Sequence, residues 1–171
     1  MEFSQLLLER YSVRKFTNQP IESDKLDKLS DSLIKAPSSK ASYPCHFYLV
    51  KDKLLIDKLS QCKPHGAAFL KDAPLVVVIT ADPAVSDVWI EDASIATTFL
   101  MLEVVNLELG GCWVQVRNRF YDETISSSQY VKNTLSIDES LEVLALYGVG
   151  YHIEFKEFRS NDNYSPVSII G

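Results

Sequence analysis

The segment that decides the fold is residues 89–109, which read WIEDASIATTFLMLEVVNLEL. In its second half the apolar run is interrupted only by Glu103, Asn106 and Glu108. A helix that is apolar almost all round must be buried on nearly every side. One sheet in a chain of 171 residues is not expected to cover it all, so we predict a homodimer built partly on this helix. The alternative is a helix buried wholly within one chain.

Clear signals flank the long helix on both sides. Gly110 and Gly111 follow it, and we expect them to cap its carboxyl end, because glycine adopts the positive φ that such caps need. Residues 112–116 then predict a strand. Upstream, residues 75–79 read LVVVI, a β-branched run typical of a central strand that is covered on both faces.

Shorter elements fill the rest of the chain, and no linker or repeat divides it. Helices are predicted near residues 3–8, 22–35, 54–62 and 127–135, strands at 46–50 and 141–146, and a strand-like tail at 167–170. The tail has no local partner and is a candidate to pair with a sheet edge of a second subunit. Strands interleaved with helices indicate one domain, residues 1–171, of the α+β class with a mixed β-sheet flanked by helices.

Composition and charge exclude several classes of function. The chain is 46% hydrophobic and 23% charged, as in an ordinary soluble globular protein. Its net charge of −6 argues against non-specific nucleic-acid binding, which needs a positive face. The longest apolar run, residues 73–81, is too short to span a bilayer. The amino terminus lacks the basic segment of a signal peptide, so we expect a cytoplasmic protein with no membrane partner.

Cysteine and histidine spacing indicates neither a disulfide framework nor a metal site. Cys45, Cys62 and Cys112 are scattered and odd in number, which fits a reducing compartment. The histidines have no acidic or cysteine partner at metal-ligand spacing. Nucleophile-elbow and phosphate-loop motifs are absent as well. We therefore expect no metal and no catalytic side chain.

A basic cluster near the amino terminus is an exception in this acidic chain. Residues 10–16 read RYSVRKF. In an extended chain Arg10, Ser12 and Arg14 alternate and project to one side. Two guanidinium groups beside a hydroxyl group suit a phosphate, because arginine binds phosphate oxygens through a rigid fork of donors. Taken alone, such a cluster is more often a solvated helix end.

Four separated elements carry a family signature. They are RYSVRKF at 10–16, APSS at 36–39, the helix from Asp92 to Gly111 that runs into Cys112-Trp113, and GYHIEFKEFR at 150–159. Each one is common by chance, whereas all four in this order and at these separations are not. Together they resemble the flavin-dependent nitroreductase family over residues 3–160. The resemblance implies a nitroreductase-type fold and an intertwined homodimer with FMN at its interface.

The resemblance also implies how FMN is held. FMN needs cations at its phosphate, hydrogen-bonding backbone along its ribityl chain and an enclosing wall at its ring. By similarity, the phosphate and the pyrimidine side are bound by Arg10, Tyr11, Ser12 and Arg14, with Lys156 and Arg159 closing on the phosphate. Without this resemblance, a solvated loop is an equally good interpretation of Lys156 and Arg159.

Two further segments are implied to contact the flavin. In the family, the loop after the second helix comes from the opposite subunit and covers the flavin, and the strand after the long helix brings backbone donors against the ring. The residues implied are Pro37, Ser38 and Ser39 in the loop, and Cys112, Trp113 and Val114 in the strand. Standing alone, the loop is an ordinary helix stop. Cys112 is better explained as a buried structural cysteine than as a reactive thiol.

The loop departs from the family pattern after its serines. Members usually continue to an asparagine and then to Gln-Pro-Trp, whereas here those places hold Ala41, Tyr43-Pro44 and Cys45. The missing asparagine removes a side chain that often reaches the flavin or the substrate, so the resemblance does not fix the acceptor. Tyr43 is expected to fill part of that space by stacking.

The function implied by the resemblance is that of an FMN-dependent oxidoreductase. NADH or NADPH would pass a hydride to FMN, and FMN would reduce a small electron-poor acceptor such as a nitroaromatic or a quinone. This chemistry takes place on the flavin and needs no catalytic side chain. Two other hypotheses stay open: an FMN-binding redox sensor or flavin carrier with little turnover, and a dimeric interaction module without flavin.

Overall fold

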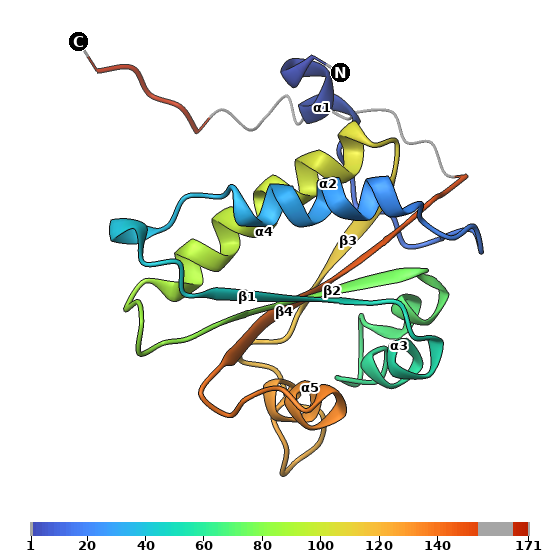
Figure 1. The fold of residues 1–171 in the computed structure, drawn as a ribbon, viewed down its shortest axis with the longest axis vertical. Coiled ribbons are helices and arrows are strands. Elements are labelled where there is room, and N and C mark those ends of the chain that lie inside the picture. The colour runs from blue at the N-terminus through green and yellow to red at the C-terminus, as the bar shows by residue number, and fades with distance from the viewer. Residues whose placement is uncertain (1, 154–165, 171) are drawn as a thin grey trace.

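The computed structural model of the chain describes residues 2–153 and 166–170. The strands of these residues form one sheet in the order β1-β2-β4-β3, and each is antiparallel to its neighbours. Figure 1 shows the sheet between two layers of helices. The strands are β1 (Cys45–Val50), β2 (Leu75–Ala81), β3 (Gly110–Gln115) and β4 (Glu142–Gly150), and the helices are α1 (Phe3–Glu9), α2 (Ser23–Ile34), α3 (Lys53–Leu59), α4 (Trp89–Asn106) and α5 (Ser127–Leu135).

The sheet separates two hydrophobic cores. Alternate residues of a strand point to opposite faces. Val76 and Val78 of β2 lie in the core that includes α3 and α5, whereas Val77 and Ile79 lie in the core that includes α2 and α4. All seven residues of β2 are buried. The prediction of a central strand covered on both faces is therefore confirmed.

The predicted α+β fold with a helix-flanked sheet is also confirmed. The mixed character expected of the sheet is limited, among the described residues, to one parallel bridge between Ser12 and Gly111 at the edge of β3. The named strands all pair antiparallel. An apolar pattern shows that a strand is buried but does not encode the direction of its neighbour.

The long helix does not extend to the two glycines predicted to cap it. Helix α4 ends at Asn106, and Glu108 adopts a φ of 60°. The N–H of Leu109 then donates to the carbonyl oxygen of Val104 at 2.9 Å. This closure is typical of a helix end in which one residue is left-handed. The predicted glycine cap is wrong, because a glutamate takes the positive φ.

The two glycines belong to β3 and are needed for close packing instead. A Cβ atom on Gly110 would lie 2.6 Å from side-chain atoms of Val13 and His152, and one on Gly111 would overlap the ring of Tyr147. Real Cβ atoms essentially never approach other atoms this closely. A side chain at either position would push the N-terminal segment or the Tyr147 ring away from β3.

Helix α4 is buried on one face only. Ala93, Leu100 and Val104 are fully buried, whereas Ile95 and Phe99, one turn apart, are 41% and 40% exposed. The alternative of a helix enclosed within one chain is therefore wrong. The homodimer that would cover the exposed face stays a prediction.

The tail does not form the predicted strand within one chain. Residues 166–170 have no regular structure, and Val167, Ile169 and Ile170 are at least 79% exposed. A strand needs a neighbouring edge to satisfy its backbone, and this segment lies against none. Its pairing with a second subunit stays a prediction.

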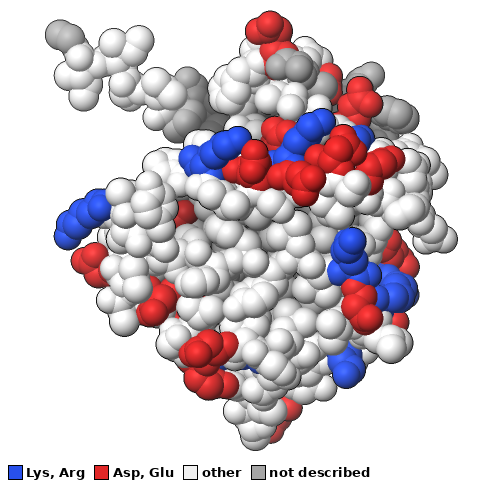
Figure 2. All heavy atoms as spheres, in the orientation of Figure 1, with Lys and Arg blue, Asp and Glu red and all other residues white. Residues whose placement is uncertain are grey.

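Charged side chains on the face seen in Figure 2 gather in a band of mixed sign. The band follows α2, where Lys28 pairs with Asp24 at 3.4 Å and Lys35 with Asp31 at 2.7 Å. Below it the centre of this face is uncharged, and side chains of both signs lie around its margins. This face therefore has no continuous positive patch for a polyanion. Among the described helices, none combines the length and apolar character needed to cross a membrane.

Substitution of Leu100 tests the contact between α4 and the sheet. Leu100 is fully buried, so Leu100→Ala is expected to lower the free energy of unfolding by about 2–5 kcal/mol through lost apolar burial and the cavity left behind. Denaturant unfolding followed by circular dichroism measures the change. Leu54→Ala on α3 is the control, because Leu54 is 73% exposed and its loss should stay within about 0.5 kcal/mol. Equal losses would contradict this packing.

Candidate functional site

The segment after α1 lies along the outer edge of β3. Ser12 forms a parallel bridge with Gly111, and the N–H of Val13 donates to the carbonyl oxygen of Gly111 at 3.0 Å. Val13 is buried, while Ser12 is half-buried and Arg14 is exposed. The segment is therefore extended here, as the alternating pattern predicts. It carries Arg10 and Arg14 to the first residues of β3.

Positive charges flank this edge at both ends. Nζ of Lys63 donates to the carbonyl oxygen of Gln115 at 2.9 Å, which places a cation at the far end of β3 from Arg10 and Arg14. In the part of the chain that the structure describes, no carboxylate lies within 4.0 Å of these three side chains. Cations without acidic partners among the described residues make this strand edge a candidate site for an anionic ligand.

Lys63 is a candidate site residue that the sequence analysis did not identify. Burial lowers its pKa; the Cys62 thiol acts in the opposite direction, as does Cys112, and the positive charge of Arg119 lowers the pKa further. An anion placed beside this lysine would favour its charged form. A lone lysine in a short polar stretch carries no pattern, so only its contact with Gln115 reveals it.

Backbone groups between these cations face outward at alternate residues. The carbonyl oxygens of Gly111 and Gln115 both point away from β4, since they accept from the N-terminal segment and from the lysine. The period along a strand is two residues, so the N–H of Trp113 shares this open edge, whereas the amides of Cys112 and Val114 are used in the ladder with β4. Of the three predicted backbone donors, Trp113 is the one that the edge presents.

The side chains of this strand have structural roles. Cys112 and Val114 are buried. The Cys112 thiol donates to the carbonyl oxygen of Trp113 at 3.6 Å, and Nε1 of Trp113 donates to Oε1 of Gln115 at 3.0 Å. This burial is typical of a structural cysteine, as predicted for Cys112.

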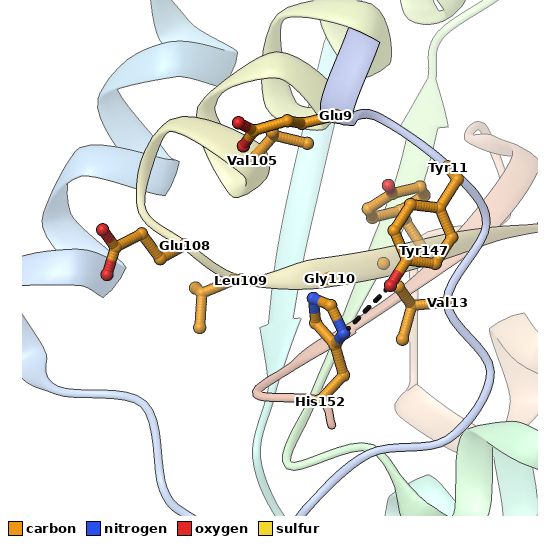
Figure 3. A pocket seen from close by; sticks show the side chains of 10 residues that line it. Glu9, Tyr11, Val13, Val105, Glu108, Leu109, Gly110, Tyr147 and His152 are labelled. Carbon is orange, nitrogen blue, oxygen red and sulfur yellow. Dashed lines mark hydrogen bonds between the residues drawn. The ribbon is translucent and has the colours of Figure 1, made fainter. Parts of the chain in front are cut away.

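A cavity of about 520 Å³ lies behind the N-terminal segment, between the end of α4 and the start of β3. Figure 3 shows Tyr11 and His152 meeting in it, with the Tyr11 hydroxyl oxygen 3.2 Å from Nδ1 of His152. Glu9 and Glu108 stand at its margin. These carboxylates would repel a phosphate. The cations along the edge of β3 are therefore the better phosphate site.

Tyr147 links this cavity to the basic cluster. Its ring is buried and lines the cavity. Burial raises the pKa of Tyr147, the Cys112 thiol adds to the shift, and the charge of Arg10 opposes it. The phenol therefore stays neutral at physiological pH, and Arg10 lies within electrostatic reach of the buried ring.

The predicted covering loop lies at the opposite end of α4. Asp92, in the first turn of α4, accepts a hydrogen bond from the N–H of Ser39 at 2.7 Å. A second cavity, of about 550 Å³, lies beside this loop, and Pro37, Ser38 and Asp92 are among the residues that line it. The structure thus brings the loop to one cavity, at the end of α4 opposite to the segment that carries Arg10 and Arg14.

The residues that replace the usual family pattern border the same cavity. Tyr43 is 65% exposed and Cys45 is half-buried, and both line it; Ala41 is exposed beside them. Burial raises the pKa of Cys45 to about 11, and the Asp92 carboxylate adds to the shift. The thiol is therefore protonated at neutral pH and is a poor nucleophile.

The two halves of the predicted cofactor site do not meet within one chain. The first cavity borders α4 at Val105 and the second borders it at Asp92, about 20 Å apart along the helix axis. A site that needs both segments must therefore combine two chains. Lys156 and Arg159 lie outside the described residues, so their predicted contact with the phosphate is not tested.

Most of the chain matches one protein family. The model of the nitroreductase family matches residues 7–63 and 60–151. The chain belongs to the nitroreductase family. Members of the nitroreductase family are oxidoreductases, so this chain is an oxidoreductase of that family.

Other nitroreductases resemble this chain along nearly its whole length. The structure of an FMN-dependent nitroreductase from Clostridium difficile R20291 is 40% identical, with a TM-score of 0.93, and the match covers 97% of this chain and 98% of that one. A protein of Archaeoglobus fulgidus, provisionally named NADH dehydrogenase/NAD(P)H nitroreductase, is 28% identical over 170 residues, which cover 96% of this chain and 94% of that protein. The NADPH:FMN oxidoreductase of Vibrio harveyi, solved with NAD+, is 19% identical with a TM-score of 0.79. The match covers 97% of this chain and 79% of the Vibrio chain, and at this identity it shows the shared fold alone.

The ionisation of Cys45 tests the environment of the second cavity. Because its pKa is raised to about 11, its alkylation by iodoacetamide is expected to keep accelerating with pH up to about 11, beyond the ordinary thiol value of 9.0. Mass spectrometry of the Cys45 peptide measures the rate, under conditions where circular dichroism shows folded protein. The guanidinium-unfolded chain is the control. A rate that levels near pH 9 in the folded protein would contradict this burial.

Proposed function

We propose that this chain is an FMN-dependent oxidoreductase that passes a hydride from NADH or NADPH, through FMN, to an electron-poor acceptor such as a nitroaromatic or a quinone. The open edge of β3 carries the proposal. It presents outward backbone groups between cations that have, among the described residues, no carboxylate within 4.0 Å. The 40% identity to a protein named an FMN-dependent nitroreductase supports it.

The residues along this edge fit the parts of FMN. Arg10, Ser12 and Arg14 would hold the phosphate, and charge-assisted hydrogen bonds of this kind contribute about 1.5–3 kcal/mol each. Three of them account for much of a micromolar affinity, about 8 kcal/mol. The N–H of Trp113 would donate to the ring, and Lys63 would donate to the hydrogen-bond acceptors on its pyrimidine side. Bound FMN supplies hydride transfer, a chemistry that amino-acid side chains do not supply.

A second copy of the chain would complete the site. The Pro37–Ser39 loop and the segment that carries Arg10 and Arg14 lie at opposite ends of α4, so we infer that the loop of one subunit covers the flavin bound by the other. Ile95 and Phe99 on α4 and Phe3 on α1 are exposed apolar side chains, and they give the second copy a surface to bury. The resulting assembly would be a homodimer with two flavins at its interface.

Replacement of the arginines tests the phosphate end. Arg10→Ala and Arg14→Ala are each expected to raise the dissociation constant of FMN about tenfold or more, because a charge-assisted hydrogen bond is lost. The unfolding midpoint of the apoprotein should not change, since neither side chain is buried. Quenching of FMN fluorescence measures the affinity, with Lys28→Ala on α2 as the control. Unchanged affinity in both arginine variants would remove this assignment.

Transient kinetics separates the enzyme from a flavin carrier or redox sensor. NADH or NADPH, mixed anaerobically with the FMN-loaded protein, is expected to bleach the flavin absorbance band. A nitroaromatic or a quinone added next should restore the band, because the reduced flavin passes its hydride on. If the flavin stays oxidised with both donors, the chain is a carrier or sensor and the enzymatic proposal fails.

A further inference from the structure

Asp92 is a buried carboxylate that lies beneath the covering loop. It is 3% exposed, and among the described residues no lysine, arginine or histidine forms an ion pair with it. Oδ1 accepts from the N–H of Ser39 at 2.7 Å, and Oδ2 accepts from the hydroxyl of Ser86 at 2.9 Å. A charge buried without a counter-ion is costly unless hydrogen bonds replace those of water. The N–H of Ser39 and the hydroxyl group of Ser86 therefore compensate for the burial of this carboxylate.

The loop tied to Asp92 has a costly backbone conformation. Lys40, Ala41 and Tyr43 adopt φ values of 53°, 53° and 49°, a region that side chains with a Cβ rarely occupy. The N–H of Tyr43 donates to the hydroxyl oxygen of Ser38 at 2.9 Å, which closes the loop on itself. Such a conformation persists only where surrounding contacts fix it. The hydrogen bond to Asp92 joins this loop to the first turn of α4.

We propose that Asp92 is the positioning residue of the covering loop, so that Asp92 of one subunit sets the FMN affinity of the site whose cations belong to the other subunit. The inference rests on the proposed function. Asp92 lines the same cavity as Pro37 and Ser38, and it acts through the backbone of Ser39 rather than through contact with the flavin. Loss of the carboxylate would free a strained loop to relax away from its covering shape.

The substitution Asp92→Asn removes the charge and keeps the size of the side chain. The dissociation constant of FMN is expected to rise at least tenfold, measured by titration of the apoprotein with FMN. Glu91→Gln is the matched control, because Glu91 is the neighbouring acid on the same turn and is exposed. Ser86→Ala removes one donor to Asp92 and is expected to weaken FMN binding less. If Asp92→Asn does not fold, the FMN affinity of Ser86→Ala still tests the inference.

Mixed dimers test whether Asp92 acts across the interface. Chains with Asp92→Asn and chains with Arg10→Ala are co-expressed with different affinity tags, and dimers that carry both tags are isolated. One site then combines intact cations with an intact loop, and the other combines both defects. We expect one tightly bound FMN per mixed dimer, whereas each parent homodimer has two weak sites. A merely structural role of Asp92 would not restore a tight site in this way.

The outcomes separate this inference from the proposed function. If the wild-type protein binds FMN and both Asp92→Asn and Ser86→Ala bind it equally well, the inference is overturned and the proposed function stands. If the mixed dimers hold two weak sites, Asp92 does not act across the interface and the inference is again overturned. If the wild-type protein does not bind FMN, the proposed function fails first, and that result is known before any variant is made.

Discussion

The burial of one face of α4 against the sheet is the contact on which the rest of the structure depends. Leu100 and Val104 lie in one core with Val77 and Ile79 of β2, and this contact fixes the helix over the sheet. Its first turn then lies beneath the loop that follows α2, and its last turn leads through Glu108 into β3. One packed helix therefore positions both the covering loop and the strand edge.

The same helix explains why the candidate site is divided. Its first turn borders the cavity beside the Pro37–Ser39 loop at Asp92, and its last turn borders the cavity behind the N-terminal segment at Val105, about 20 Å away along the helix axis. Its outer face carries apolar side chains that one chain leaves exposed. A second copy of the chain would account for the divided site and for the exposed apolar face. It would bury that face and bring its loop to the cations of the other chain. The charge distribution agrees with this account: in a chain of net charge −6, no carboxylate of the described residues lies within 4.0 Å of Arg10, Arg14 or Lys63, which favours binding of a small anion.

Apolar runs are enough to predict α4 and the buried β2, because the run at 89–109 is too long for a strand and the run at 75–79 is short and β-branched. They do not locate the end of α4, since the left-handed residue is Glu108 and two glycines stand just beyond it. The cluster at residues 10–14 can be seen in the sequence as a local exception in charge. Lys63 cannot, because its place in the site depends on a contact with Gln115, 52 positions away. Contacts of that kind appear only once the sheet is assembled.

Analytical ultracentrifugation of the FMN-loaded protein, followed at the flavin absorbance band, tests the shared site most directly. The account predicts that flavin sediments with a dimer of the 19.3 kDa chain, at one flavin per chain. Dilution that separates the subunits should release the flavin at the same concentration, because each chain alone holds only half of the site. Flavin that stays tightly bound to a 19.3 kDa monomer would contradict it.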